Sequence, residues 1–126
     1  MSATLRSVSL LRSFGFALEG VSYLIRTQRS AQIEIAIGVV VIAVAAWLGV
    51  SAIEWAVLIL AMALVLALEA LNTAIELAVT LASPERHPLA KAAKDVAAAA
   101  VFIAAAGAFL MGLAILGLRL KARMSG

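Results

Sequence analysis

The stretch WAVLILAMALVLALEALNTAIELAVTLA, residues 55–82, is apolar for half its length and then becomes polar on one face. It carries no charge before Glu69, and its helical pattern continues to Ala82, where Ser83-Pro84 ends it. At about 1.5 Å per residue this helix is about 40 Å long, whereas the hydrocarbon core of a bilayer is about 30 Å thick. The sequence therefore predicts a transmembrane helix over residues 54–82 that projects from the membrane at one end.

Two further apolar runs flank this helix. Residues 35–53 and 96–118 contain no charged residue, and both have the length that a membrane crossing requires. A tight connection at Gly49-Val50-Ser51 precedes the central helix. We therefore predict an all-α membrane protein with a single domain. Its expected parts are a surface helix 1–32, transmembrane helices 33–50, 54–82 and 95–118, a polar loop 83–94 and a basic tail 119–126, which together make up residues 1–126.

Residues 1–32 differ from the rest, because charged residues interrupt every apolar stretch. A secretory signal needs an unbroken apolar segment close to its start, so we do not expect one here. The apolar residues recur at spacings near three and four, as in a helix that lies in the membrane interface. They are Leu11, Phe14, Leu18, Val21, Tyr23 and Ile25. We therefore expect an amphipathic helix on the membrane surface.

The composition agrees with a membrane location. Of the 126 residues, 65% are hydrophobic and 13% are charged, whereas soluble domains average about half apolar and about a quarter charged. This excludes a water-soluble monomer and intrinsic disorder. The absence of cysteine excludes disulfides, thiol nucleophiles and cysteine-based zinc sites. The net charge of +3 is spread over short polar segments, so we expect attraction to anionic lipid and no nucleic acid partner.

The basic residues predict the orientation in the membrane. The N-terminal segment and the loop 83–94 lie on the same side, because two crossings separate them, and they hold seven of the ten basic residues. Segments rich in Lys and Arg stay in the cytoplasm. We therefore expect the N-terminus and this loop in the cytoplasm and a solvated tail outside. The tail carries Arg119, Lys121 and Arg123, and Trp47 and Trp55 are expected at the outer interface.

Polar side chains of the central helix form one stripe. At about 100° per residue its members fall within about 60° of Glu69, all in the cytoplasmic half of the helix. They are Glu69, Asn72, Thr73, Glu76 and Thr80. Polar residues in membrane bundles often only join helices, but two carboxylates on one face usually bind a cation, a metal or a proton. Glu69 and Glu76 are therefore candidate functional residues.

Further polar residues fall at the same depth, just before the first and third transmembrane helices. They are Gln28, Arg29, Glu34, His87, Lys91, Lys94 and Asp95. All three helices thus bring polar side chains to the cytoplasmic interface and almost none to the outer one. A channel or carrier would need polar positions along its whole path. A site at one interface instead suits chemistry between a water-soluble reagent and a lipid headgroup.

The segments EALNTAIE (69–76) and SPERHPLAKAAKDV (83–96) resemble the prokaryotic diacylglycerol kinase family, whose members are small three-span enzymes unrelated to soluble kinases. The part SPERHPLAK is similar to the undecaprenol kinase branch of that family. The resemblance implies a homotrimer with sites between protomers, in the bacterial plasma membrane. It also implies Mg²⁺ as the cofactor and phosphate transfer from ATP to a lipid hydroxyl, with diacylglycerol or undecaprenol as the lipid.

The resemblance also implies roles for individual residues. Glu69 would be the general base that takes the proton from the lipid hydroxyl, and Asn72 would orient Glu69 or the phosphate. Glu76 would hold the metal, with Gln28 as a second ligand where many relatives have a Glu. Thr80 stands where the family often has an Asp, and Lys94 would neutralise phosphate charge. The expected nucleotide contacts are Gln28, Glu76, Glu85, Arg86, His87, Lys94 and Asp95.

The chemistry of these residue types agrees with the implied activity. Phosphoryl transfer needs positioning, a metal and cationic support more than covalent participation, and a partly desolvated carboxylate is a good proton acceptor. No GxxxxGK[ST] loop is present, so side chains and metal would have to hold the phosphates. The alternatives from other classes are a non-catalytic membrane scaffold and a cation-binding subunit. Lys94 argues against the cation-binding subunit, because a cation site gains nothing from a positively charged lysine beside it.

Overall fold

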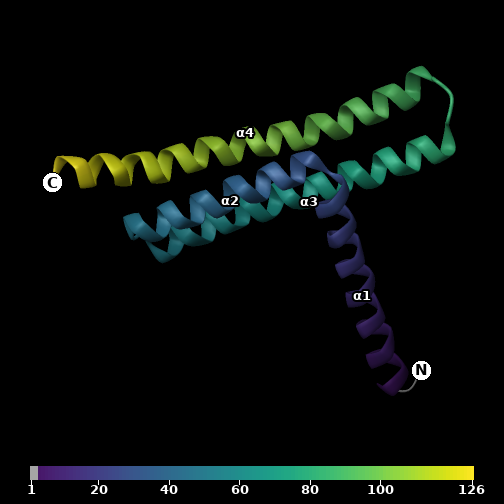
Figure 1. The fold of residues 1–126 in the computed structure, drawn as a ribbon, viewed down its shortest axis with the longest axis horizontal. Coiled ribbons are helices and arrows are strands. Elements are labelled where there is room, and N and C mark those ends of the chain that lie inside the picture. The colour runs from purple at the N-terminus through teal and green to yellow at the C-terminus, as the bar shows by residue number, and fades with distance from the viewer. Residues whose placement is uncertain (1–2) are drawn as a thin grey trace.

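The structure is a computed structural model that describes residues 3–126. In this range all of the regular structure is α-helical. The helices are α1 (Ala3–Thr27), α2 (Arg29–Leu48), α3 (Ala52–Ala82) and α4 (Pro88–Ser125). Three of them, α2, α3 and α4, are long and apolar enough to cross a membrane, so the all-α prediction with three such helices is confirmed. Figure 1 shows these three running side by side, with α1 leaving them at a steep angle.

The boundary between the first two helices lies earlier than predicted. Residues 1–2 of the predicted surface helix are outside the described residues, and α1 then continues through both of its glycines to Thr27. Gln28 has an extended backbone, with φ −107° and ψ 111°, and α2 begins at Arg29. The chain therefore changes direction at Gln28, and the first turn of α2 belongs to the segment 1–32 that was assigned to the surface.

The connection between α3 and α4 is shorter than the predicted loop 83–94. It spans residues 83–87, because α4 already begins at Pro88. Proline is favoured in the first turn of a helix, where its missing N–H would have no partner. His87 caps the same turn, since its Nδ1 accepts a hydrogen bond from the backbone N–H of Leu89 at 3.1 Å. At its other end α4 continues through the predicted tail to Ser125.

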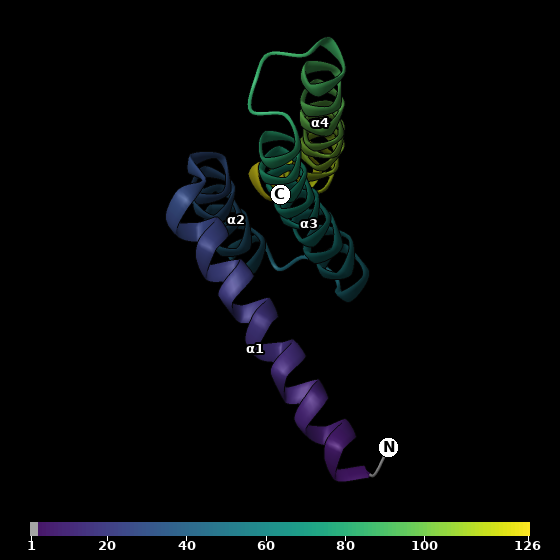
Figure 2. The ribbon, with the colours of Figure 1, turned by 90° about the vertical axis from the view of Figure 1, so that its right-hand side faces the viewer.

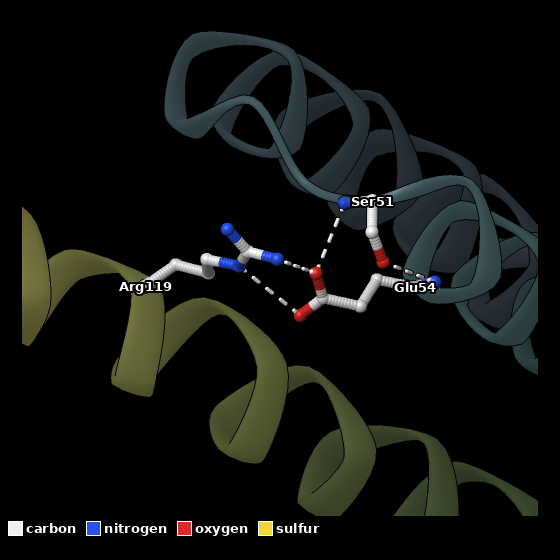
Figure 3. Close-up of polar contacts among 3 residues, drawn as sticks. All are labelled: Ser51, Glu54 and Arg119. Carbon is white, nitrogen blue, oxygen red and sulfur yellow. Dashed lines mark hydrogen bonds and ion pairs between the residues drawn. The ribbon is translucent and has the colours of Figure 1, made fainter.

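The turn between α2 and α3 is built from residues that suit its backbone. Gly49 has φ 67°, the left-handed region that favours glycine, and it ends α2. Ser51 then caps α3: its hydroxyl accepts the N–H of Glu54, and the Glu54 carboxylate accepts the N–H of Ser51. Figure 3 shows this reciprocal pair. It fixes the start of α3 immediately after the turn.

The C-terminal end of α4 packs back onto this turn. Arg119 forms an ion pair with Glu54 (Figure 3). The guanidinium carbon of Arg123 lies 4.6 Å from the centre of the Trp47 ring, and its Nη1 donates to the Trp47 carbonyl at 3.3 Å. Both arginines are nevertheless exposed, as expected for the tail, and Trp47 is a stacking partner. Together these contacts tie the end of α4 to the α2–α3 turn.

The chain buries little of its apolar surface. α4 lies along α3 (Figure 2), and a small core of Ala45, Val50 and Leu58 forms near the α2–α3 turn. The accessible surface is 9223 Å², whereas a compact soluble protein of 13.0 kDa exposes about 6300 Å². Many large apolar side chains of α2, α3 and α4 are exposed. Lipid or further protein chains must cover them, because soluble proteins do not expose apolar patches of this extent to water.

Candidate active site

The polar stripe of α3 faces the inside of the bundle at the level where α2 begins. Glu69, Asn72 and Thr73 are buried, and Glu69 is only 3% exposed. Glu76 is half-buried and Thr80 is exposed. Figure 1 shows that α3 and α4 continue beyond the start of α2. The stripe therefore runs from the bundle interior into the part of α3 that projects beyond α2, and its first three members face protein.

Glu69 is held by contacts from two helices. The hydroxyl of Ser30 on α2 donates to Oε1 of Glu69, with 2.7 Å between the oxygens. Within α3 the hydroxyl of Thr73 donates to the main-chain carbonyl of Glu69 at 2.9 Å. The carboxyl of Glu34 lies beside that of Glu69, and its Oε2 is buried without a hydrogen-bond partner among the described residues. A buried carboxylate with one oxygen fixed is suited to accept a proton through the other.

Asn72 contacts Glu76 and not Glu69. Its Nδ2 lies 3.4 Å from Oε1 of Glu76, one helical turn further on. Its Oδ1 is buried and has no hydrogen-bond partner within the part of the chain that the structure describes. Asn72 therefore presents an unused carbonyl oxygen next to the Glu76 carboxylate.

An open, shallow cavity of about 730 Å³ lies over the projecting part of the stripe. Glu76 and Thr80 of α3 line it together with Lys94 of α4 and Pro84 of the connection. The ammonium nitrogen of Lys94 donates to the Thr80 hydroxyl at 3.0 Å. The structure thus places a carboxylate and an ammonium group at one cavity, a combination that can hold a metal-bound phosphate.

The other predicted nucleotide residues surround the α3–α4 connection without joining this cluster. Asp95 pairs with Lys91 at 2.6 Å, and both side chains are exposed. Glu85 and Arg86 are exposed in the connection itself, and His87 caps α4. These residues border the cavity end of the bundle, but among the described residues they make no hydrogen bond to the polar stripe.

The predicted metal ligands are only partly brought together. Gln28 lies at the α1–α2 break, and its Nε2 donates to the Thr27 hydroxyl at 3.2 Å. In the described part of the chain no three His, Asp or Glu side chains converge as a metal site. Mg²⁺ on a triphosphate needs only one or two protein oxygens, because phosphates and water supply the rest. The Glu76 carboxylate and the unused Oδ1 of Asn72 fit this requirement.

Ser30 is a site residue that the sequence pattern did not identify. The sequence feature that could have identified Ser30 is its position one helical turn before Glu34, on the same face of α2. A serine near a helix start is more often a cap or solvated. Its partner Glu69 lies 39 residues away, so the contact depends on how α2 and α3 pack.

Three helices of membrane-spanning length, with a buried carboxylate and a carboxylate–lysine cavity toward one end, define a small integral-membrane protein whose candidate site lies toward that end. The chain belongs to the prokaryotic diacylglycerol kinase family, whose profile matches residues 15–116. The matched range contains every predicted site residue, so the resemblance seen in residues 69–96 is confirmed.

The relatives of the chain carry two names. A diacylglycerol kinase of Synechocystis sp. is 49% identical over 105 residues, which are 82% of this chain and 60% of the relative. An undecaprenol kinase of Bacillus subtilis is 40% identical over 104 residues, 82% of this chain and 85% of the relative. A diacylglycerol kinase of Pseudomonas aeruginosa is 41% identical over 95 residues, 75% of this chain and 77% of the relative. The protein is thus a member of a family of membrane lipid kinases.

Proposed function

We propose that the protein is an ATP-dependent kinase that phosphorylates the hydroxyl group of a membrane lipid alcohol. The observation that carries the proposal is the buried Glu69 carboxylate, held by Ser30 at 2.7 Å. It lies on the same helix face as the cavity with Glu76 and Lys94. A proton acceptor and a place for phosphate thus share one stripe. The relatives named diacylglycerol kinase and undecaprenol kinase support a lipid alcohol as the acceptor.

In the proposed reaction Glu69 accepts the proton of the lipid hydroxyl through Oε2, while Ser30 fixes Oε1. The lipid oxygen forms a bond to the γ-phosphorus of ATP as the bond to the β-phosphate oxygen breaks, and ADP leaves. Lys94 offsets the negative charge of the phosphates. Glu69 then releases its proton to solvent, and the site is ready for another cycle.

The metal and the nucleotide would be held beyond Glu69 along α3. Mg²⁺ bound with ATP would neutralise phosphate charge and draw electrons from the γ-phosphoryl group. Glu76 would hold it, with the carbonyl oxygen of Asn72 beside it and Gln28 as a further neutral oxygen donor. The remaining nucleotide contacts would come from the α3–α4 connection and the first turns of α4: Glu85, Arg86, His87 and Asp95.

The position in the membrane belongs to the same proposal. The 31 residues of α3 correspond to about 46 Å, which exceeds the hydrocarbon thickness of about 30 Å. The projecting part with the cavity would stand outside the hydrocarbon. The excess of basic residues at that end supports the cytoplasmic face of the bacterial plasma membrane, with α1 lying on the surface as an amphipathic helix. The homotrimer with shared sites that the family resemblance implies would cover part of the exposed apolar surface.

Purified protein in lipid vesicles tests the proposal directly. With Mg-ATP and either diacylglycerol or undecaprenol, supplied side by side, we expect ADP and the matching lipid phosphate in equal amounts. Both products should disappear when EDTA removes Mg²⁺. The ratio of the two rates identifies the preferred lipid. ADP without lipid phosphate, or no turnover of either lipid, would favour a non-catalytic scaffold or a cation-binding subunit.

Replacing Ser30 with Ala is expected to lower the turnover number about tenfold, because a hydrogen bond to a charged group contributes about 1.5–3 kcal/mol. The KM for ATP should not change, since Ser30 contacts Glu69 and does not line the cavity. Ser30→Thr keeps the hydroxyl and should retain most of the rate. Initial rates at saturating lipid over a range of ATP concentrations measure both effects. A Ser30→Ala protein as fast as the wild type would show that Glu69 is oriented without Ser30.

A further inference from the structure

Thr80 and Lys94 form the one hydrogen bond between side chains of α3 and α4 at the cavity end of the bundle, among the side chains that the structure describes. The ammonium nitrogen of Lys94 lies 3.0 Å from the Thr80 hydroxyl oxygen. The two helices are antiparallel and are joined by only residues 83–87 (Figure 2). This short connection brings the two positions level with each other, 14 residues apart in the chain.

The positive charge of Lys94 is not neutralised in the described part of the chain. The ion pairs there are Lys91–Asp95 and Arg119–Glu54, so the neighbouring Asp95 is already engaged. Glu76 lines the same cavity but forms no ion pair with Lys94. A hydroxyl accepts a hydrogen bond and leaves the charge of its donor in place. Lys94 therefore presents a full positive charge at the cavity.

The hydroxyl of Thr80 also restricts where that charge lies. A lysine has a long flexible stem, and when it is free its ammonium group samples many positions. Threonine has few side-chain conformations within a helix, so its hydroxyl is an acceptor of restricted position. Lysine binds phosphate as a point charge, and the strength of that contact depends on its distance from the phosphate. The Thr80 contact thus holds the charge on one wall of the cavity, one helical turn from Glu76.

We infer that Thr80 is a positioning residue: its hydroxyl holds the Lys94 ammonium group where nucleotide phosphates bind, without neutralising it. The inference rests on the proposed function, because it needs phosphate in this cavity. An acidic residue at position 80 would pair with the lysine, whereas threonine orients it and preserves its charge for the ligand.

Thr80→Val tests the inference, because valine has the shape of threonine and lacks the hydroxyl. The KM for Mg-ATP should rise about three- to tenfold, as expected for the net contribution of one hydrogen bond at an exposed position. The KM for lipid should stay close to its wild-type value. Thr80→Ser should restore the wild-type KM, since it keeps the hydroxyl. Calorimetric binding of a non-hydrolysable Mg-ATP analogue should show the same weakening without any turnover.

A double variant separates positioning from a general effect on the cavity. Lys94→Met removes the ammonium group, and adding Thr80→Val to it should weaken analogue binding no further, because Thr80 acts only through Lys94. Equal analogue binding by the wild type and Thr80→Val would overturn the inference, and so would additive effects in the double variant. Absence of lipid phosphate with the wild-type protein would instead count against the proposed function, while the binding measurement still decides the role of Thr80.

Discussion

A Glu69→Gln variant is expected to lose lipid phosphorylation by a factor of at least about a hundred, since general base catalysis contributes about 10²–10⁴-fold. An amide keeps the shape of the side chain, and its carbonyl oxygen can still accept the hydrogen bond from Ser30. It cannot take up the proton of the lipid hydroxyl. Affinity for Mg-ATP should not change, because Glu69 acts on the lipid hydroxyl and does not line the nucleotide cavity.

Lipid phosphate formation and analogue binding are to be measured on the same vesicle preparations. Glu19→Gln is the matched control, because Glu19 is an exposed carboxylate on α1, the helix that leaves the bundle in Figure 1. It should retain the wild-type rate. If the Glu69 variant keeps more than about a tenth of the wild-type rate, the general base is another group. Glu34 would then be the first candidate, since its carboxyl lies beside that of Glu69.

The membrane-spanning helices could be predicted from the sequence because their cause is local. A run of about twenty apolar residues is stable across a bilayer as a helix, since the helix satisfies its own backbone hydrogen bonds. The shared face of Glu69, Asn72 and Thr73 follows equally from helical geometry, because residues three and four apart lie on one side. All three side chains are buried. The polar stripe could therefore be predicted without knowledge of how the helices pack.

Contacts between helices could not be predicted in this way. The pairs Ser30–Glu69 and Thr80–Lys94 depend on how far one helix is shifted along another. A shift of one turn, about 5.4 Å, would bring other residues together. The same holds for Arg119 and Glu54, which lie 65 residues apart; an arginine near a chain end is usually solvated. The break between α1 and α2 at Gln28 could not be predicted either, because no proline or glycine marks it in the sequence.

Distances along α3 give a physical reason to expect sites shared between chains. Lys94 is held level with Thr80, about 16 Å along the helix from Glu69, and Glu76 lies about 10 Å from Glu69. In phosphoryl transfer the reacting oxygen and phosphorus must come within about 3.5 Å of each other, with the base in contact with that oxygen. A neighbouring chain that placed its own cavity, with its Glu76 and Lys94, against Glu69 would bring the phosphates within reach of the base. The exposed apolar surface of the helices calls for such neighbours or for lipid.

Two inactive variants are therefore expected to restore activity when they are assembled together. With Glu69→Gln and Lys94→Met chains in equal amounts, a shared site is intact when one neighbour supplies Glu69 and the other supplies Lys94. In the proposed homotrimer each oligomer that contains both variants has one intact site in three, so about a third of the wild-type activity should return once mixed oligomers are purified. Chains with different affinity tags, purified on both, establish that mixing has occurred, and each variant alone gives the background rate. Activity that stays at the background rate in purified mixed oligomers would place Glu69 and Lys94 of each site in a single chain.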